Sequence, residues 1–380
     1  MLSRQIDHPV YIDTNEELAR FCEQWSQASV LTLDTEFIRT DTFYPIGALI
    51  QVSDGTGCFL IDPLEIDDFT GFKALMTNTT ITKVLHSCSE DLEVFDRLLG
   101  VLPKPLIDTQ IAAGMNGLGF SLGYQAMTEA LLQIHVAKGE TRSNWLQRPL
   151  TDSQIHYAAL DVAYLPDMYT MLCNALAENG RMPWLQEECD KLINNYGGPD
   201  AIRLHYLKVK SAWKLSRPQL GVLQLVIEWR EHKARERNRP RGRVLKDRSC
   251  FEMARLQPTT IHELSAIDEI GPKIVRNNGD DLLSLIKQGQ ELNESALPPA
   301  LPKPLPPANG TIMKRLKAHV VKRAEQLNMA PELLAKKKDY EALLRSGFHG
   351  SEYQLPETLL GWRKKVIGDD LLDILKKEGA

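Results

Sequence analysis

The amino-acid sequence predicts an α/β domain, in which a mixed sheet is flanked by helices, followed by two all-α modules. Strand-like apolar runs alternate with helical stretches through the first part of the chain. Beyond Asn194 nearly every segment has helical periodicity, and a proline-rich stretch divides this helical part in two. We therefore expect four regions, at 1–200 (α/β domain), 208–292 (first module), 293–310 (proline-rich linker) and 311–380 (second module).

Three strand-like segments open the predicted α/β domain. Residues 30–38 alternate apolar and polar side chains, which is the pattern of a half-buried strand. Two further apolar runs cover residues 47–54 and 58–64. The Asp54-Gly55 step between them is a strong signal for a tight turn, so these two runs are expected to form a hairpin.

A strand, a helix and a second short element are expected next. Residues 83–86 form a short apolar run that predicts a buried strand. Ser87 and Glu90 have the spacing of a capping box, which predicts a helix through residues 91–100. Residues 106–113 are interpreted as a strand or as the entry to a helix.

A long helical segment is expected to close the α/β domain. Residues 151–176 combine helical periodicity with good helix formers. Pro166 lies near the middle of this segment and predicts a break or kink, because proline lacks the N–H that a helix interior requires. The predicted order of elements is β-β-β-α-β-α.

Composition excludes several classes of protein. With 43% hydrophobic and 25% charged residues in 380 positions, the chain resembles a globular protein. It has no uncharged apolar run of about 18 residues, so we expect no membrane span and a cytoplasmic location. The six cysteines are far apart and form no Cys-x-x-Cys pair, which predicts reduced thiols and argues against zinc or dithiol redox chemistry.

Positive charge is concentrated locally in a chain whose formal net charge is −5. Residues 228–248 contain nine Lys and Arg against four Asp and Glu, an excess of five positive charges. Such a run is either a solvated helix face or a phosphate-binding patch. A second basic surface in the last module consists of Lys314, Arg315, Lys317, Lys322 and Arg323.

Acidic side chains provide the candidate chemistry. Asp34 and Glu36 are two residues apart on a predicted strand, so the pleat points both to one face. Two neighbouring carboxylates repel each other, and Mg²⁺ or Mn²⁺ would relieve this, since such ions prefer carboxylate oxygens. The alternative is an exposed strand end that carries solvated acids.

A second group of polar side chains lies on the predicted helices. Tyr157 and Asp161 are four residues apart and share a helix face, whereas His156 is about 140° round the helix from Asp161. If the helix began later, His156 would be the partner instead. Taken alone, Tyr157 also fits a half-buried core aromatic, Asp161 a solvated acid, and Asp91 an acid at the positive end of its helix.

Together these segments resemble a known family. Residues 31–37 (LTLDTEF), 84–95 (VLHSCSEDLEVF) and 154–165 (QIHYAALDVAYL) resemble the three exonuclease motifs of the DEDD superfamily, in its tyrosine-bearing branch. Residues 142–161 match the signature of the ribonuclease D family. The resemblance spans the whole chain and implies an exonuclease domain of ribonuclease H-like fold, followed by two HRDC modules.

The resemblance implies a set of roles for matching residues. Asp34, Glu36 and Asp161 would bind one divalent ion, and Asp34 with Asp91 would hold a second. Tyr157 would orient the attacking water. These ions, Mg²⁺ or Mn²⁺, would support hydrolysis of phosphodiester bonds without a side-chain nucleophile. Trp145 and Arg148 are candidates for RNA contact, by stacking and by phosphate pairing. A core tryptophan and a surface arginine are equal alternatives.

The expected activity is that of a 3′→5′ exoribonuclease that releases nucleoside 5′-monophosphates from RNA with a free 3′ end. The resemblance points to tRNA precursors as substrates. No Gly-Lys-Ser/Thr step marks a nucleotide-binding loop, so the activity is expected to need no ATP. A DNA 3′→5′ exonuclease and a catalytically silent RNA-binding scaffold remain alternatives, and the sequence leaves the oligomeric state open.

Overall fold

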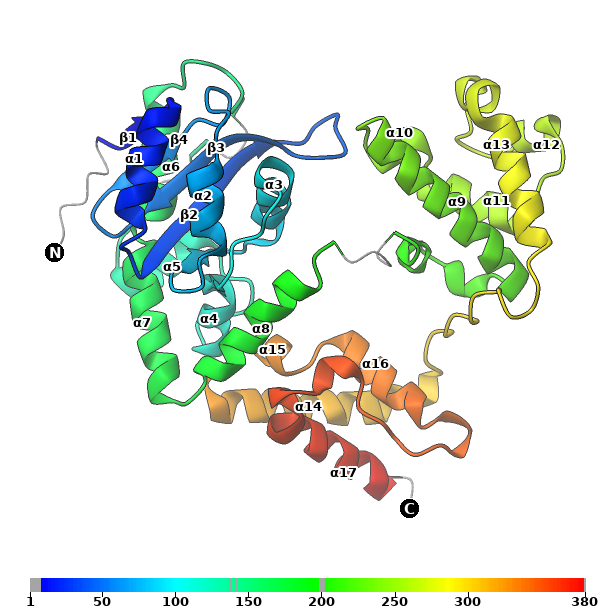
Figure 1. Cartoon of the computed structure of the whole chain (residues 1–380). Coiled ribbons are helices and arrows are strands. Elements are labelled where there is room, and N and C mark those ends of the chain that lie inside the picture. Colours follow the sequence, from blue (N-terminus) through cyan, green and yellow to red (C-terminus); the bar gives the residue numbers. More distant parts are fainter. Residues whose placement is uncertain (1–7, 137–138, 141–142, 198–201, 379–380) are drawn as a thin grey trace. The chain divides into compact units, whose positions relative to one another are not determined.

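The computed structural model describes residues 8–136, 139–140, 143–197 and 202–378. These residues form two compact units. The first unit consists of the described residues of 1–38, 46–194 and 305–380, and the second of those of 39–45 and 195–304. Each unit is described separately below (Figure 1).

The first unit is built on a six-stranded mixed sheet. The strands lie in the order β1-β4-β3-β2-β5-β6. The β2–β3 and β3–β4 pairs are antiparallel, and the other three pairs are parallel. Their bounds are β1 Val10–Ile12, β2 Val30–Ile38, β3 Ile46–Ser53, β4 Cys58–Ile61, β5 Thr82–Leu85 and β6 Leu106–Asp108.

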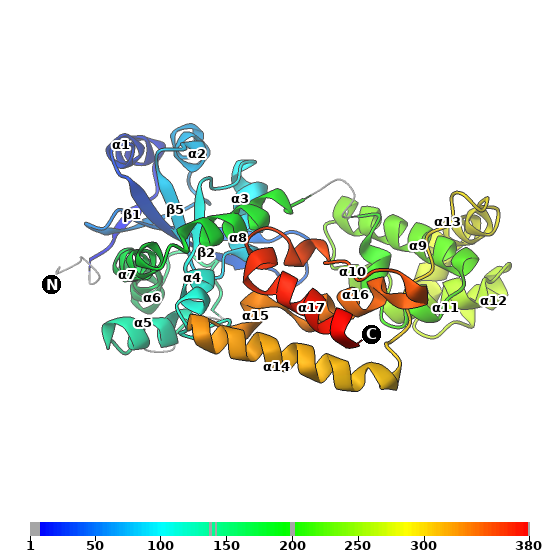
Figure 2. The same ribbon diagram turned by 90° about the horizontal axis from the view of Figure 1, so that it is seen from below.

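Eight α-helices among the described residues of the α/β domain lie around this sheet. They are α1 Asn15–Trp25, α2 Thr70–Thr77, α3 Ser89–Leu99, α4 Thr109–Met115, α5 Tyr124–Leu132, α6 Asp152–Ala163, α7 Leu165–Glu178 and α8 Met182–Asn194. In the view of Figure 2, α1, α2 and α3 lie on one side of the sheet, and α5, α6 and α7 lie on the other. This confirms the expected α/β class with a mixed sheet and helices on both faces.

The predicted hairpin is confirmed in detail. Strands β3 and β4 are antiparallel neighbours. Asp54 Oδ1 accepts hydrogen bonds from the backbone N–H of Thr56 at 2.9 Å and of Gly57 at 3.2 Å. Gly55 has a φ of +87°, which a residue without a side chain adopts at no steric cost. The turn is therefore specified by local chemistry that is visible in the sequence.

The break at Pro166 is also confirmed, because α6 ends at Ala163 and Pro166 occupies the first turn of α7. Other expectations are corrected. The structure has β1 and α1 before the first predicted strand, and α2 before β5. The capping box of Ser87 with Glu90 does not form: α3 starts after Cys88 without a side-chain cap, and Ser87 has a φ of 61°.

The last part of the chain packs with the α/β domain in one unit. Its α-helices are α14 Gly310–Leu327, α15 Pro331–Leu334, α16 Lys337–Ser346 and α17 Asp369–Glu378. A single hydrophobic cluster joins Leu185 and Cys189 of α8 to Leu333 and Leu344. The backbone N–H of Ala330 also donates to the carbonyl of Gly114 at 2.8 Å.

The second unit is a helical module with its own hydrophobic core. Its α-helices are α9 Arg217–Glu236, α10 Arg241–Val244, α11 Asp247–Leu256, α12 Ile261–Ser265 and α13 Pro272–Gln290. Ser216 caps α9 in a capping box with Gln219. A short segment from the α/β part of the sequence, residues 39–45, belongs to this unit, and Phe43 is 4% exposed there.

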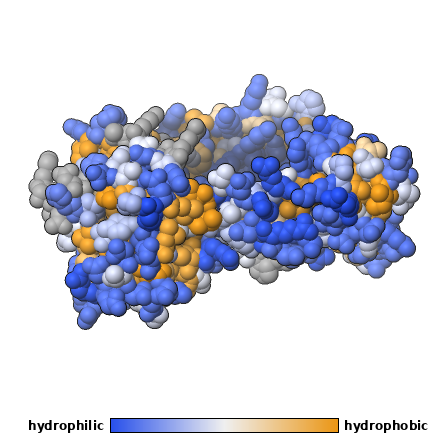
Figure 3. Space-filling model, turned by 90° about the horizontal axis from the view of Figure 1, so that it is seen from above, coloured by the Kyte–Doolittle hydropathy of each residue, from blue (hydrophilic) through white to orange (hydrophobic). Residues whose placement is uncertain are grey.

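Figure 3 shows a face on which hydrophilic side chains predominate and hydrophobic ones gather in smaller patches. Among the described residues, no helix combines the length and the apolar character that crossing a bilayer requires. All six cysteines lie in the described part of the chain as thiols outside any disulfide, and five of them are buried.

Candidate active site

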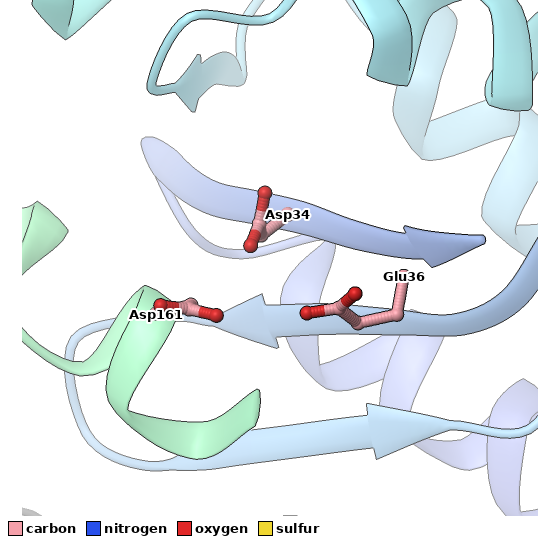
Figure 4. A group of neighbouring side chains, drawn as sticks. All are labelled: Asp34, Glu36 and Asp161. Atoms are coloured by element: carbon pink, nitrogen blue, oxygen red, sulfur yellow. The ribbon is translucent and has the colours of Figure 1, made fainter. Parts of the chain in front are cut away.

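The two strand carboxylates lie near the middle of the sheet. Asp34 and Glu36 are on β2, where they pair in register with Gln51 and Leu49 of β3. Because side chains alternate along a strand, Asp34 and Glu36 point to the same face. Asp161, on α6, reaches the same place from outside the sheet, so residues more than 120 positions apart meet there (Figure 4).

The three carboxylates form a compact group. One oxygen from each of Asp34, Glu36 and Asp161 lies within 4.8 Å of the other two. Figure 4 shows the carboxylates of Glu36 and Asp161 pointing toward each other, with Asp34 beside them. Oxygen ligands at this spacing suit a hard divalent cation. The structure therefore brings together three of the four predicted acids in an arrangement that fits a metal ion.

Electrostatics at this group favour a bound cation. Burial, and then the like charges around it, raise the pKa of Glu36 to about 9 and hold that of Asp34 well above its usual range. Burial also raises the pKa of Asp161 to about 7, although a hydrogen bond from Tyr157 opposes this. Ionising all three acids is thus unfavourable in the protein alone, and a divalent ion would supply the compensating charge.

The helix register supports Tyr157 as the partner of Asp161. Thr151 caps α6, and its backbone N–H donates to Gln154 Oε1 at 3.0 Å, which fixes the first turn. The phenol of Tyr157 forms a side-chain hydrogen bond with Asp161. His156 is exposed on another face of the same helix. The register inferred from the sequence is therefore the one that the structure has.

Asp91 lies in the first turn of α3. Thr35 of β2 donates from Oγ1 to Asp91 Oδ1 at 2.5 Å. Asp91 is 7% exposed and stands outside the compact group of three acids. Its charge still acts on that group, since it raises the pKa of both Asp34 and Glu36.

Asp108 is a positioning residue that the sequence analysis did not single out. Its carboxylate accepts hydrogen bonds from the backbone N–H of Ser87 at 3.1 Å and of Cys88 at 3.0 Å. It also caps α4 by accepting from the N–H of Gln110 at 2.8 Å. Asp108 thereby fixes the backbone immediately before α3, the helix that carries Asp91. Only the N-cap role could be recognised from the sequence.

Trp145 and Arg148, the predicted substrate contacts, both have partners within the protein, which favours the alternative of a core tryptophan. Trp145 is 2% exposed within a core cluster, so its ring has no open face for a base. Arg148 donates from Nε and Nη2 to the two oxygens of Asp62, at 2.5 and 2.6 Å, and from Nη2 to the carbonyl of Ala48 at 2.7 Å. It anchors the segment before α6 to the sheet.

The ring of Tyr157 is packed from two sides. Trp145 lies beside it with a centroid separation of 6.1 Å. On another side runs the backbone of Gly139, where an added Cβ would overlap Tyr157 Cδ2 and lie 3.0 Å from Cε2. Gly139 could not be predicted as part of this site, because the sequence around a glycine does not show which distant ring it contacts.

Comparisons with known proteins agree with this geometry. A family model for the 3′-5′ exonuclease matches residues 9–177, one for the HRDC domain matches residues 219–286, and one for the ribonuclease D C-terminal HRDC domain matches residues 307–371. Ribonuclease D of Pseudomonas paraeruginosa is 46% identical over 366 residues, which cover 96% of this chain and 97% of that protein.

The chain belongs to the ribonuclease D family. Ribonuclease D of Escherichia coli K12 is 37% identical over 370 residues, covering 96% of this chain and 98% of that protein. Its crystal structure superposes with a TM-score of 0.88 at 35% identity, over 97% of this chain and 99% of that one. Membership of the ribonuclease D family makes the chain a hydrolytic 3′-5′ exoribonuclease with HRDC domains.

Proposed function

We propose that this exoribonuclease cleaves by a two-metal-ion mechanism at the group formed by Asp34, Glu36 and Asp161, releasing nucleoside 5′-monophosphates. The proposal rests on the close spacing of these three acids, since one carboxylate oxygen of each lies within 4.8 Å of the other two. Asp34, Glu36 and Asp161 would hold the first ion, and Asp34 with Asp91 the second. Mg²⁺ and Mn²⁺ both suit a site made only of carboxylates.

When bound, the two ions would allow a water to act as hydroxide at neutral pH and would offset charge on the departing 3′ oxygen. The protein's residues have separate tasks. Asp161 accepts the hydrogen bond that orients the Tyr157 phenol. The phenol in turn would position the attacking water, since it stays protonated while burial keeps its pKa far above neutrality.

We further propose structured RNA, and tRNA precursors in particular, as the natural substrate. The Escherichia coli relative is described as an exoribonuclease involved in structured RNA processing. Two HRDC domains accompany the nuclease domain here, which supports a substrate larger than a short single strand. We take 1–200, 208–292, 293–310 and 311–380 as the working boundaries for variants that separate these parts.

The test uses the full-length protein and a 5′-labelled single-stranded RNA, with no ATP present. With Mg²⁺ or Mn²⁺ we expect a ladder that shortens from the 3′ end, release of nucleoside 5′-monophosphates, and complete arrest on addition of EDTA. Asp161→Asn should abolish the ladder and leave the far-UV circular dichroism spectrum unchanged. Asp152→Asn, an exposed acid on the same helix, is the matched control and should retain activity.

A matched DNA strand and a tRNA precursor with a 3′ extension complete the experiment. Trimming of the precursor to a defined end, with little loss of the DNA, is the expected result. Equal cleavage of DNA and RNA would contradict the RNA preference. RNA binding without any shortening, in the presence of either ion, would instead favour the silent scaffold.

A further inference from the structure

Most of the guanidinium groups in the basic segment 228–248 are engaged inside the second unit. Arg230 Nη1 lies 2.6 Å from Asp247 Oδ1, and Arg241 Nε lies 2.5 Å from the buried carboxylate of Glu231. Arg241 also stacks over the ring of Phe43, with its guanidinium carbon 4.7 Å from the ring centroid. These groups stabilise the module, so its RNA contact has to be sought on other side chains.

A cavity of about 790 Å³ lies next to this network. It is formed by the segment that precedes α9 together with α11. A neighbouring hollow of about 440 Å³ shares Val209 and Asp247 with it. A volume of several hundred Å³ is what a ligand pocket for a small organic group needs, so the larger cavity can admit a base and its sugar.

The lining of the larger cavity has two parts. Val209, Leu215 and Phe251 give it an apolar wall, and Val209 and Leu215 are 5% and 6% exposed. Lys210, Lys214 and Arg248 are exposed cations around it. Arg248 pairs with Asp268 at 3.1 Å, but both side chains are more than 65% exposed, and such a pair is weak enough to exchange for a phosphate.

We propose that this cavity of the first HRDC domain binds one unpaired nucleotide of the RNA. The base would lie against Phe251 and the apolar wall, and Lys210 and Lys214 would contact the flanking phosphates. Aromatic and apolar surface beside cations is how proteins hold unpaired bases, whereas a duplex hides its base faces. The inference needs only that the chain binds RNA, and it is independent of the metal-dependent mechanism proposed above.

The experiment measures binding in EDTA with the full-length protein. The probes are a fluorescent RNA hairpin with a short unpaired 3′ extension and the same hairpin with a blunt end. A gel run after the titration shows whether the RNA is intact, so binding is scored separately from cleavage. We expect tighter binding of the extended hairpin, and quenching of a 2-aminopurine placed in its extension, because the base stacks.

Three variants test the residues. Phe251→Leu, which keeps an apolar side chain, should weaken binding of the extended hairpin by at least about 5-fold and restore the 2-aminopurine signal. The double variant Lys210→Ala/Lys214→Ala should also weaken binding and reduce the slope of log K against log salt by about 1.4. Lys273→Ala/Arg276→Ala removes the same charge from exposed positions that line neither cavity, and it should bind as the parent does.

Several outcomes would overturn the proposal. An equal loss of affinity in the Lys273/Arg276 variant would show that only overall charge matters. Unchanged quenching in Phe251→Leu would show that the base does not reach the cavity, even if the lysine variant lost affinity. Tighter binding of the blunt hairpin than of the extended one would also show that no unpaired base enters the cavity. Thermal unfolding of each variant shows whether it is folded, and the lysine variant tests the site even if Phe251→Leu does not fold.

Discussion

The ring of Tyr157 shows how the geometry of the proposed site depends on packing. Its hydroxyl is bound to Asp161, while Trp145 and the backbone of Gly139 lie against the ring itself. A side chain held on several sides loses little further freedom in the reaction, which is how preorganisation raises a rate. The contact that the structure gives Trp145 at this site is therefore with the Tyr157 ring.

Gly139→Ala should displace the Tyr157 ring and lower kcat on the order of 100-fold, because small misplacements of a catalytic group cost about that much. Steady-state kinetics on a short RNA measure this. In a Tyr157→Phe background the same change should have little further effect, since no hydroxyl remains to misplace. Gly123→Ala, where a Cβ meets nothing within 4 Å, is the control. If Gly139→Ala lowered kcat equally in the parent and in the Tyr157→Phe background, the change would disturb the fold and not the position of the hydroxyl.

Tyr157→Phe alone should slow cleavage about 100-fold, since it removes the group that would orient the water. His156→Gln should leave the rate near that of the parent, because His156 is exposed away from the acids. Both rates come from single-turnover cleavage of a labelled RNA. Mg²⁺ titration should show similar metal dependence for both variants. A large loss in His156→Gln with none in Tyr157→Phe would reverse these roles.

Much of the proposed site could be predicted from sequence, because its main features are local. The spacing of Asp34 with Glu36 and of Tyr157 with Asp161 fixes which side chains share a face, whatever the rest of the chain does. The part that could not be predicted depends on distant contacts. Asp108 binds a backbone turn about 20 residues away, and Thr35 of β2 binds Asp91 of α3 across a sequence separation of 56 residues.

Helix α8 of the nuclease domain is joined to the last module by a ring contact and an ion pair. Trp184 stacks on Trp362 at 4.7 Å with 9° between the ring planes. Four residues further along α8, Glu188 accepts hydrogen bonds from Arg363 Nη1 and Nη2 at 2.5 and 2.6 Å. Burial alone would raise the pKa of Glu188, but the Arg363 contacts outweigh it and lower this pKa to about 2.

Glu188→Gln should lower the free energy of unfolding by about 3 kcal/mol at pH 7, because it leaves Arg363 buried without its partner charge. The folded-state pKa of Glu188 lies below its usual 4.5, so the stabilisation is fully present above about pH 4.5. It should then fade as the pH falls toward 2. Urea unfolding at several pH values measures the difference between parent and variant.

Glu178→Gln, at an exposed position on α7, is the control for that series. Its unfolding free energy should match that of the parent at every pH. A difference for Glu188→Gln that stays constant down to pH 3 would show that lost packing, and not the ion pair, carries the effect.

At the scale of the whole molecule, the two HRDC domains have different structural relations to the nuclease domain. The sequence shows them as two similar modules, and helical periodicity predicts both correctly as all-α. Only the structure shows that the last module shares a hydrophobic cluster with α7 and α8 of the nuclease. In this cluster the residues of the last module are more than 100 positions from those of α7 and α8 in the sequence, so local sequence patterns could not predict their contacts. Strand β1 was not predicted because its three residues are too few to show an alternating pattern.

Removing residues 305–380 should therefore destabilise the nuclease part itself. The deletion would uncover apolar side chains such as Leu185, and exposed apolar patches favour aggregation. We expect a lower Tm and binding of a hydrophobic dye. Leu333→Ala, which makes a cavity in the same cluster, should cost about 2–5 kcal/mol in unfolding free energy, while Leu360→Ala at a 43% exposed position should cost little. An unchanged Tm after the deletion would contradict the shared core.

The segment 39–45 sets a limit on how the first HRDC domain can be exchanged between proteins. Phe43 lies under Arg235 and Arg241, and Asn238 Oδ1 accepts hydrogen bonds from the N–H groups of Phe43 and Tyr44 at 3.0 and 3.1 Å. A fragment of residues 195–304 alone would lack Phe43 and its contacts with Arg235, Asn238 and Arg241. A portable version of the domain would need the seven residues grafted back, or a substitute ring built into its own sequence.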